Sequence, residues 1–264
     1  MAVQSTPTPL DILKLLGCTE RKGEPYLKEF ESVHNIKLPP LLFDFFSAAW
    51  NHPLFQTSDV WAAGQPCLRF SYEELGETIA DWQEDWKADP EQYSDDFCFQ
   101  LSQVPREQWP EHVPNYLEIG SDYSAGVVTF GIRMSDLDQP DPPVYILHEC
   151  DPETDWKVMD RTLSLFLMRI LADMLTCAMY NTARNVLEQD GWQYSKTKSM
   201  PEAQEWAAEL GIDLSKAALC GALYAAAVTP DVCRYCYVEE KNAFFVLKDD
   251  ESSGETTCAV LTKR

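Results

Sequence analysis

Apolar residues recur three or four positions apart in several stretches of the chain, a spacing that places them on one face of an α-helix. The first stretch carries residues typical of helix ends: Thr8 as the cap, Pro9 in the first turn and Gly17 after the last turn. The same spacing predicts further helices that start at Pro25, run from Pro40 to Trp50, stop at Pro90, and span 162–187, 201–210 and the alanine-rich run 215–228.

Between these helices, the sequence alternates between apolar and polar residues, as β-strands do. The segment YLEIGSDYSAGVVTFGI, residues 116–132, is predicted to form a hairpin in which Gly120 and Gly126 give the turn its backbone freedom. Asp122 is expected to bond to the backbone of the same turn, which is a structural role. Other strands are predicted at 54–70, 143–149 and 155–159, and three more at the C-terminal end, with turns at 241–242 and 249–255.

The composition supports a packed α+β protein. Apolar residues make up 45% of the 264 residues and aromatic residues 12%, which is enough for a substantial core. The character of the chain changes after Asp190-Gly191. We therefore predict a main domain at 1–189 and a small C-terminal extension at 190–264, built from short helices and a three-stranded β-meander.

The charge of the chain restricts its partners. It has 43 acidic and 21 basic residues, a net charge of −22. Because nucleic-acid binding depends on Lys and Arg contacts with phosphates, we expect no nucleic-acid partner, and anionic membrane surfaces are disfavoured for the same reason. Basic proteins are the favoured partners. The alternative is that the charge serves solubility alone.

Two acidic segments also carry tryptophan. Residues 71–100 hold ten acidic residues and one lysine, and residues 136–160 hold eight acidic residues and one lysine. Aromatic anchors surrounded by charge are typical of protein-binding surfaces, although these tryptophans also suit a core. The predicted partner-binding residues are Asp81, Trp82, Glu84, Asp85, Trp86, Asp136, Asp138, Asp141 and Trp156.

No catalytic, cofactor-binding or metal-binding residue is predicted from the common motifs. The glycines at 120, 126 and 131 lack the spacing of a dinucleotide or phosphate loop, and neither H-E-x-x-H nor G-x-S-x-G occurs. The stretch that begins at Asp136 resembles a calcium loop, but its sixth position is Asp141 instead of glycine and its twelfth is Leu147 instead of glutamate.

Nine cysteines lie along the chain without a framework spacing. The N-terminal residues show no basic region followed by an apolar region, so we expect reduced thiols and a cytoplasmic location. Cys233 and Cys236 form a C-x-x-C, but a structural zinc site needs two further ligands, and only Cys220 and Cys258 are candidates. Buried apolar thiols are the favoured interpretation.

Residues 162–183 are not predicted to cross a membrane. The most apolar long stretch, residues 162–183, is interrupted by Arg169 and Asp173. A membrane-spanning helix needs about 20 mostly uncharged residues. We therefore expect a core helix in this part of the chain.

The order of several motifs resembles that of the SUKH superfamily. The motifs are Leu38-Pro39-Pro40-Leu41-Leu42-x-x-Phe45-Phe46-x-x-x-Trp50-Asn51, then Tyr116-Leu-Glu-Ile119-Gly120-Ser-Asp122-x-x-x-Gly126, Val144-Tyr145-Ile146-Leu147, and Trp156 before Leu163-Ser-Leu-Phe166-Leu167. This superfamily includes SMI/KNR-type regulators of fungal cell-wall synthesis and many bacterial toxin-immunity proteins. The resemblance covers residues 10–187. The insertion at 71–110 and the extension at 190–264 depart from the family pattern.

The resemblance implies a mixed, strongly bent β-sheet packed by helices, a long helix after the central strands, and no enzymatic activity. Members of the superfamily bind proteins, and several neutralise nuclease or deaminase toxins. The functional hypothesis is therefore a cytoplasmic, non-enzymatic protein that binds a basic protein partner, with toxin immunity as the specific form. Two alternatives stay open: a metal-dependent hydrolase that uses Asp136, Asp138 and Asp141, and a zinc-stapled module built on Cys233 and Cys236.

Overall fold

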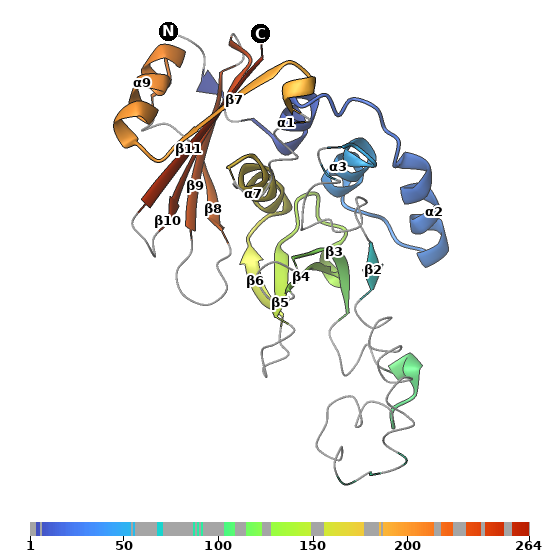
Figure 1. Cartoon of the computed structure of the whole chain (residues 1–264). Coiled ribbons are helices and arrows are strands. Elements are labelled where there is room, and N and C mark those ends of the chain that lie inside the picture. The colour runs from blue at the N-terminus through green and yellow to red at the C-terminus, as the bar shows by residue number, and fades with distance from the viewer. Residues whose placement is uncertain are drawn as a thin grey trace.

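The structure is a computed structural model. It describes residues 4–5, 7–53, 55, 68–70, 87, 89, 91, 103–108, 115–122, 128–148, 156–176, 185, 187–213, 218–223, 231–238, 241–250 and 255–263. These residues form two antiparallel sheets with helices between and beside them, so the predicted α+β class is confirmed (Figure 1).

Three helices form the N-terminal part. They are α1 (Pro9–Leu15), α2 (Glu24–His34) and α3 (Pro40–Ala49). The predicted start of the first helix is confirmed, because the Thr8 side chain accepts a hydrogen bond from the Asp11 N–H while the Asp11 carboxylate accepts one from the Thr8 N–H. The hydrogen bonds from Thr8 lower the pKa of Asp11.

Sheet B is a meander of five strands. Its strands, in spatial and chain order, are β2 (Arg69–Phe70), β3 (Tyr116–Asp122), β4 (Val128–Arg133), β5 (Val144–His148) and β6 (Lys157–Asp160). Two short 3₁₀ helices lie next to it, η3 (Arg106–Gln108) and η4 (Met134–Asp136).

The predicted hairpin strands are present as β3 and β4, but β3 extends further than expected. Gly120 and Asp122 belong to β3, where they pair with Phe130 and Val128. The register shifts between Glu118 and Gly120, so Gly120 lies at a bulge within the strand instead of in the turn. Gly126 lies outside the described residues.

Sheet A contains the C-terminal strands. They are β7 (Trp192–Thr197), β8 (Ala218–Leu223), β9 (Asp231–Val238), β10 (Ala243–Asp250) and β11 (Glu255–Lys263). The predicted C-terminal meander is β9, β10 and β11. Strand β7 pairs with β11 at one edge, and at the other β9 pairs with both β8 and the short N-terminal strand β1 (Gln4–Ser5).

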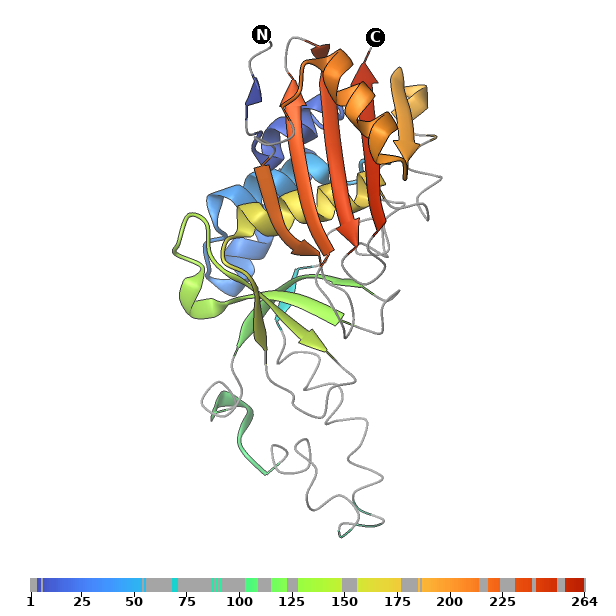
Figure 2. The same ribbon diagram turned by 90° about the vertical axis from the view of Figure 1, so that its left-hand side faces the viewer.

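Helix α9 (Met200–Leu210) lies between β7 and β8 in the chain and covers one face of sheet A (Figure 2). It confirms the predicted helix, since Ser199 accepts a hydrogen bond from the Glu202 N–H and Gly211 adopts the left-handed conformation after the last turn. The helix predicted at 215–228 is wrong for 218–223, which form β8. Pairing with β9 and packing against α7 override the helix propensity of alanine there.

Helix α7 (Leu163–Thr176) lies between the two sheets, where it contacts β6 of sheet B and strands β8 to β11 of sheet A (Figure 1). Within it, Arg169 is 1% exposed and forms an ion pair with Asp160 of β6, which is 5% exposed. This pair accounts for a charge inside an apolar helix. Among the described residues, no helix has the length and hydrophobicity needed to cross a membrane.

Sheet A is buried on both faces. Phe244, Val246 and Leu261 join the main core, which also holds the buried residues of α1, α3 and α7 and the inner face of sheet B. The alternate residues Phe245 and Leu247 join a second cluster beneath α9. The continuous apolar run of β10 follows from these two environments, because successive strand residues point to opposite faces.

Candidate interaction site

The outer face of sheet B carries an aromatic cluster. In β3, β4 and β5 the inward residues, such as Leu117, Phe130 and Ile146, join the main core next to α7. The residues that alternate with them therefore face away from α7. Together with the 3₁₀ helix after β4 and the residue before β6, they form what we call the sheet B cluster: Tyr116, Arg133, Asp136, Tyr145 and Trp156.

The rings of this cluster are stacked in a defined order. Trp156 lies nearly parallel to Tyr116, with ring centroids 4.2 Å apart and an interplanar angle of 17°. Tyr116 meets Tyr145 edge-on at 5.3 Å. Such pairs contribute about 0.5–1.5 kcal/mol beyond the area they bury, so they hold one another in place.

Gly131 provides the surface on which Trp156 rests. A Cβ atom at this position would come within 2.8 Å of Trp156 Cζ3 and 3.2 Å of the Leu117 carbonyl oxygen. The first approach is closer than Cβ atoms come to other atoms, and the second is tight, so glycine permits the observed position of the indole ring. This contact explains one of the three glycines of the hairpin segment.

Arg133 is fixed by the cluster while its side chain stays exposed. Its Cζ lies 4.6 Å from the centre of the Tyr145 ring, a cation–π distance, and its Nε donates a hydrogen bond of 2.9 Å to the Tyr116 hydroxyl. The register of the hairpin creates this contact, because Arg133 is paired directly with Tyr116. The guanidinium group is therefore held in one orientation at the surface.

The protonation states support this arrangement. The hydrogen bond to Tyr116 raises the pKa of Arg133, so the guanidinium remains charged. Burial raises the pKa of Tyr145, although the charge of Arg133 opposes this effect. Tyr145 thus stays protonated at neutral pH, and its hydroxyl donates to the Asp136 carboxylate at 3.4 Å.

The cluster includes two of the predicted partner-binding residues, Asp136 and Trp156. Asp138 is exposed in the turn that follows η4. Asp141 has a structural role, because its carboxylate accepts hydrogen bonds from the Ser164 N–H at 2.7 Å and the Ser164 hydroxyl at 2.6 Å. It thereby ties the β4–β5 connection to the first turn of α7. The other predicted residues, Asp81, Trp82, Glu84, Asp85 and Trp86, lie outside the described residues.

The carboxylates of Asp136 and Asp141 do not converge on a common site. Asp136 is engaged by Tyr145 and Gln139, and Asp141 by Ser164. Within the described parts of the chain, no group of three or more His, Cys, Asp or Glu residues is arranged to hold a metal ion.

The cysteines of sheet A lie in an apolar environment. Cys236 and Cys258 are free thiols, each 1% exposed, in the cluster beneath α9. Burial raises the pKa of each to about 12, so both are protonated at neutral pH. Cys233 and Cys236 both belong to strand β9.

Three members of the cluster were missed in the sequence: Tyr116, Arg133 and Tyr145. A signal for them exists, since each alternates with a buried apolar residue in a predicted strand and must therefore occupy the outer face. Their convergence, however, depends on strand register across three strands. Alternation within one strand does not fix that register.

Comparisons with family models, with curated proteins and with solved structures found no match for this chain. The SUKH resemblance therefore stays a prediction from sequence motifs.

Proposed function

We propose that the protein is a non-enzymatic, cytoplasmic binding protein that recognises a basic protein partner through the sheet B cluster. Toxin immunity, as in the SUKH superfamily, is the specific form we propose. The observation that carries the proposal is Arg133, an exposed cation stacked on Tyr145 and hydrogen-bonded to Tyr116, beside the half-buried Trp156.

The residue types and their rigidity support a binding surface. Tryptophan, tyrosine and arginine are enriched among the residues that dominate binding energy at protein interfaces. Here, stacking and hydrogen bonding order the arginine before any partner arrives, so little side-chain entropy is lost on binding. The cluster therefore combines suitable chemistry with preorganisation.

Charge acts at two ranges in this proposal. The net charge of −22 attracts a basic protein from a distance and raises its association rate. At contact distance, Asp136 accepts a hydrogen bond from Tyr145, on whose ring Arg133 stacks, so an acceptor and a donor belong to the same cluster. Such a mixed pattern favours specificity, because a partner must present complementary groups in the right order.

The two alternative functions receive less support from the geometry. A hydrolase built on Asp136, Asp138 and Asp141 needs these carboxylates to share an ion, yet Asp136 and Asp141 are bonded to different parts of the fold. A zinc module needs thiolate ligands, whereas Cys236 and Cys258 are buried among apolar residues and burial raises the pKa of each to about 12.

The test is direct binding of candidate basic proteins encoded by adjacent genes, measured by isothermal titration calorimetry. We expect Trp156→Ala and Arg133→Ala each to weaken binding at least tenfold, as at interface hot spots, where losses reach about 2 kcal/mol or more. Arg161→Ala is the matched control, an exposed arginine outside the cluster, and should change affinity less than threefold.

Thermal unfolding of each variant separates lost contacts from lost folding. Full affinity in folded Trp156→Ala and Arg133→Ala would refute the assigned surface. Turnover of a small molecule, with no binding to the candidate protein, would refute the proposed function as a whole.

A further inference from the structure

A pocket of about 230 Å³ lies at a second place, where helices α1 and α3 end. Its lining includes Gly17 and Cys18 after α1, Ala48 and Trp50 at the end of α3, and the charged Glu20 and Lys22 between the helices. None of these residues belongs to the sheet B cluster.

The end of α3 makes this pocket attractive to cations. Helix α3 has ten residues and its last turn borders the pocket through Ala48 and the cap residue Trp50. A helix C-terminus carries a partial charge equivalent to about −0.5 and stabilises nearby cations. Helix α1 ends beside it, with Gly17 directly after its cap residue.

Acidic residues add to this field. The negative charge of Asp190 raises the pKa of both Cys18 and His52, which line the pocket. Burial raises the pKa of Cys18 to about 12 and lowers the pKa of His52, and Asp190 opposes the second effect. At neutral pH, the pocket therefore holds a neutral thiol and a predominantly neutral imidazole.

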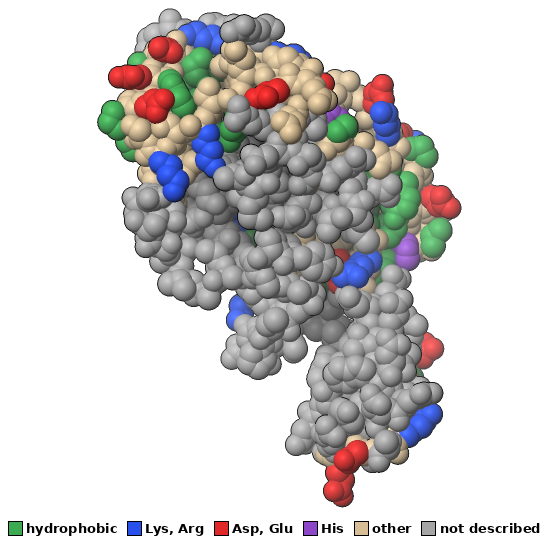
Figure 3. Space-filling view, viewed as in Figure 1, with side chains coloured by type: hydrophobic (Ala, Val, Ile, Leu, Met, Phe, Trp, Pro, Cys, Tyr) green, Lys and Arg blue, Asp and Glu red, His purple; other side chains and the backbone are tan. Residues whose placement is uncertain are grey.

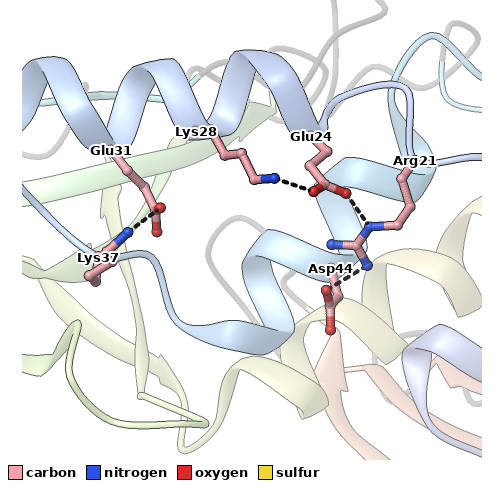
Figure 4. Close-up of polar contacts among 6 residues, drawn as sticks. All are labelled: Arg21, Glu24, Lys28, Glu31, Lys37 and Asp44. Carbon is pink, nitrogen blue, oxygen red and sulfur yellow. Dashed lines mark hydrogen bonds and ion pairs between the residues drawn. The ribbon is translucent and has the colours of Figure 1, made fainter.

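The basic residues near the pocket are engaged by carboxylates. Lys22 pairs with Glu20 at 2.9 Å. Figure 4 shows the neighbouring belt along α2, in which Arg21 bridges Glu24 and Asp44, Lys28 binds Glu24, and Lys37 binds Glu31. Because each of these cations already has an acidic partner, their repulsion of an incoming cation is reduced.

Trp50 and Tyr26 form an aromatic pair beside the pocket. The ring of Trp50 lies 4.5 Å from that of Tyr26, and a Cβ on Gly23 would come within 2.8 Å of Trp50 Cβ, so the tryptophan is packed tightly in place. Tyr26 is 41% exposed and Val33, two turns later on α2, is 72% exposed. Figure 3 shows hydrophobic side chains among charged ones over this helix.

We propose that this pocket receives an arginine side chain of the protein partner, with the exposed apolar residues of α2 contacting the surface around it. The guanidinium would lie against the Trp50 ring, near the end of α3 and within the field of Asp190 and Glu20. This inference rests on the proposed function, because it names the partner chemistry for a second contact point.

The first test uses N-acetyl-arginine amide as the probe and N-acetyl-citrulline amide as its neutral control of the same shape. In an NMR titration we expect saturable shifts of the Trp50 and His52 side-chain signals with the arginine probe, at least fivefold tighter than with citrulline. Equal responses to both probes, or no response at these residues, would overturn the inference.

Two variants that change the charge of the pocket in opposite directions make the test more specific. We expect Glu20→Gln to weaken the arginine probe at least threefold, since it also releases Lys22, and Lys22→Gln to strengthen it. Both positions are exposed, so the fold should tolerate the changes. Glu29→Gln, an exposed position elsewhere on α2, is the control and should leave affinity unchanged. A uniform response of all three variants would contradict the assignment.

The two proposals fail separately. If the arginine probe does not bind at the pocket but Arg133→Ala still weakens partner binding, the pocket assignment is refuted and the proposed function stands. If the probe binds equally well in Trp156→Ala and Arg133→Ala and the protein has no affinity for the partner, the proposed function is refuted. The pocket then remains assigned as an arginine-binding site.

Discussion

The two sheets of this protein differ in what packs against their faces. Sheet A is covered on both faces, by the main core with α7 on one side and by α9 on the other. Sheet B faces the core on one side only, and its other side carries the cluster of Tyr116, Arg133 and Trp156. The strands reflect this difference: β10 is continuously apolar from Ala243 to Leu247, whereas β4 places Thr129, Gly131 and Arg133 between buried apolar residues.

This contrast assigns stability to sheet A and, in the proposed function, partner recognition to sheet B. A sheet with two covered faces has little surface left for a partner, so its side chains contribute to stability. A sheet with one face outside the core can hold polar and aromatic groups in a fixed arrangement. Helix α7 links the two parts, since it packs on both sheets.

The largest expected effect is in sheet A. We expect Phe245→Ala to reduce the free energy of unfolding by about 4 kcal/mol, because a large buried ring beneath α9 leaves a cavity. Phe244→Ala, on the opposite face, should cost a comparable amount. Urea denaturation followed by circular dichroism gives both values. A loss below about 1 kcal/mol for either variant would mean that this face is not packed as described.

The ion pair between Arg169 and Asp160 should come next. We expect Arg169→Met to cost about 3 kcal/mol, since it leaves the buried Asp160 carboxylate without its partner. The double variant Arg169→Met with Asp160→Leu should recover much of this loss, because neither charge is then buried. Equilibrium unfolding of the two single variants and the double variant provides a double-mutant cycle. Additive losses would argue against the pair.

The smallest expected effect on stability belongs to the outer face of sheet B. We expect Gly131→Ala to cost about 2 kcal/mol through overpacking against Trp156 and the Leu117 carbonyl. The variant should also displace the indole ring, which near-ultraviolet circular dichroism detects. Thr129→Ala, at a neighbouring outer position on the same strand, serves as the comparison for the near-ultraviolet signal of Trp156. An unchanged tryptophan signal in Gly131→Ala would contradict the observed contact.

Much of the fold could be predicted from local patterns. Thr8 and Pro25 mark helix starts within one residue of where the structure has them, the helix predicted at 201–210 is present as α9, and alternation favoured the strand that forms β4. The segment 218–223 could not be predicted in this way. Its alanine content favours a helix in isolation, and only the free edge of β9 and the surface of α7 make a strand the better solution.

The candidate site was predicted in part. Trp156 and Asp136, predicted because aromatic and acidic residues lie close in the sequence, belong to the sheet B cluster. The bond of Asp141 to Ser164, 23 residues away, was not predicted. Tyr116, Arg133 and Tyr145 come from three strands. Their meeting depends on the pairing of Tyr116 with Arg133 and of Gly131 with Tyr145, which no single segment encodes visibly.

By itself, the sequence determined the α+β class, the acidic surface, most helix boundaries and the C-terminal meander, because these follow from side-chain periodicity and from the chemistry of individual residues. The tertiary structure decided what periodicity leaves open: that α7 joins two sheets, that Arg169 finds Asp160, and that Arg133 lies on Tyr145. These are contacts between distant segments. Their free energy depends on geometry that exists only after the chain has folded.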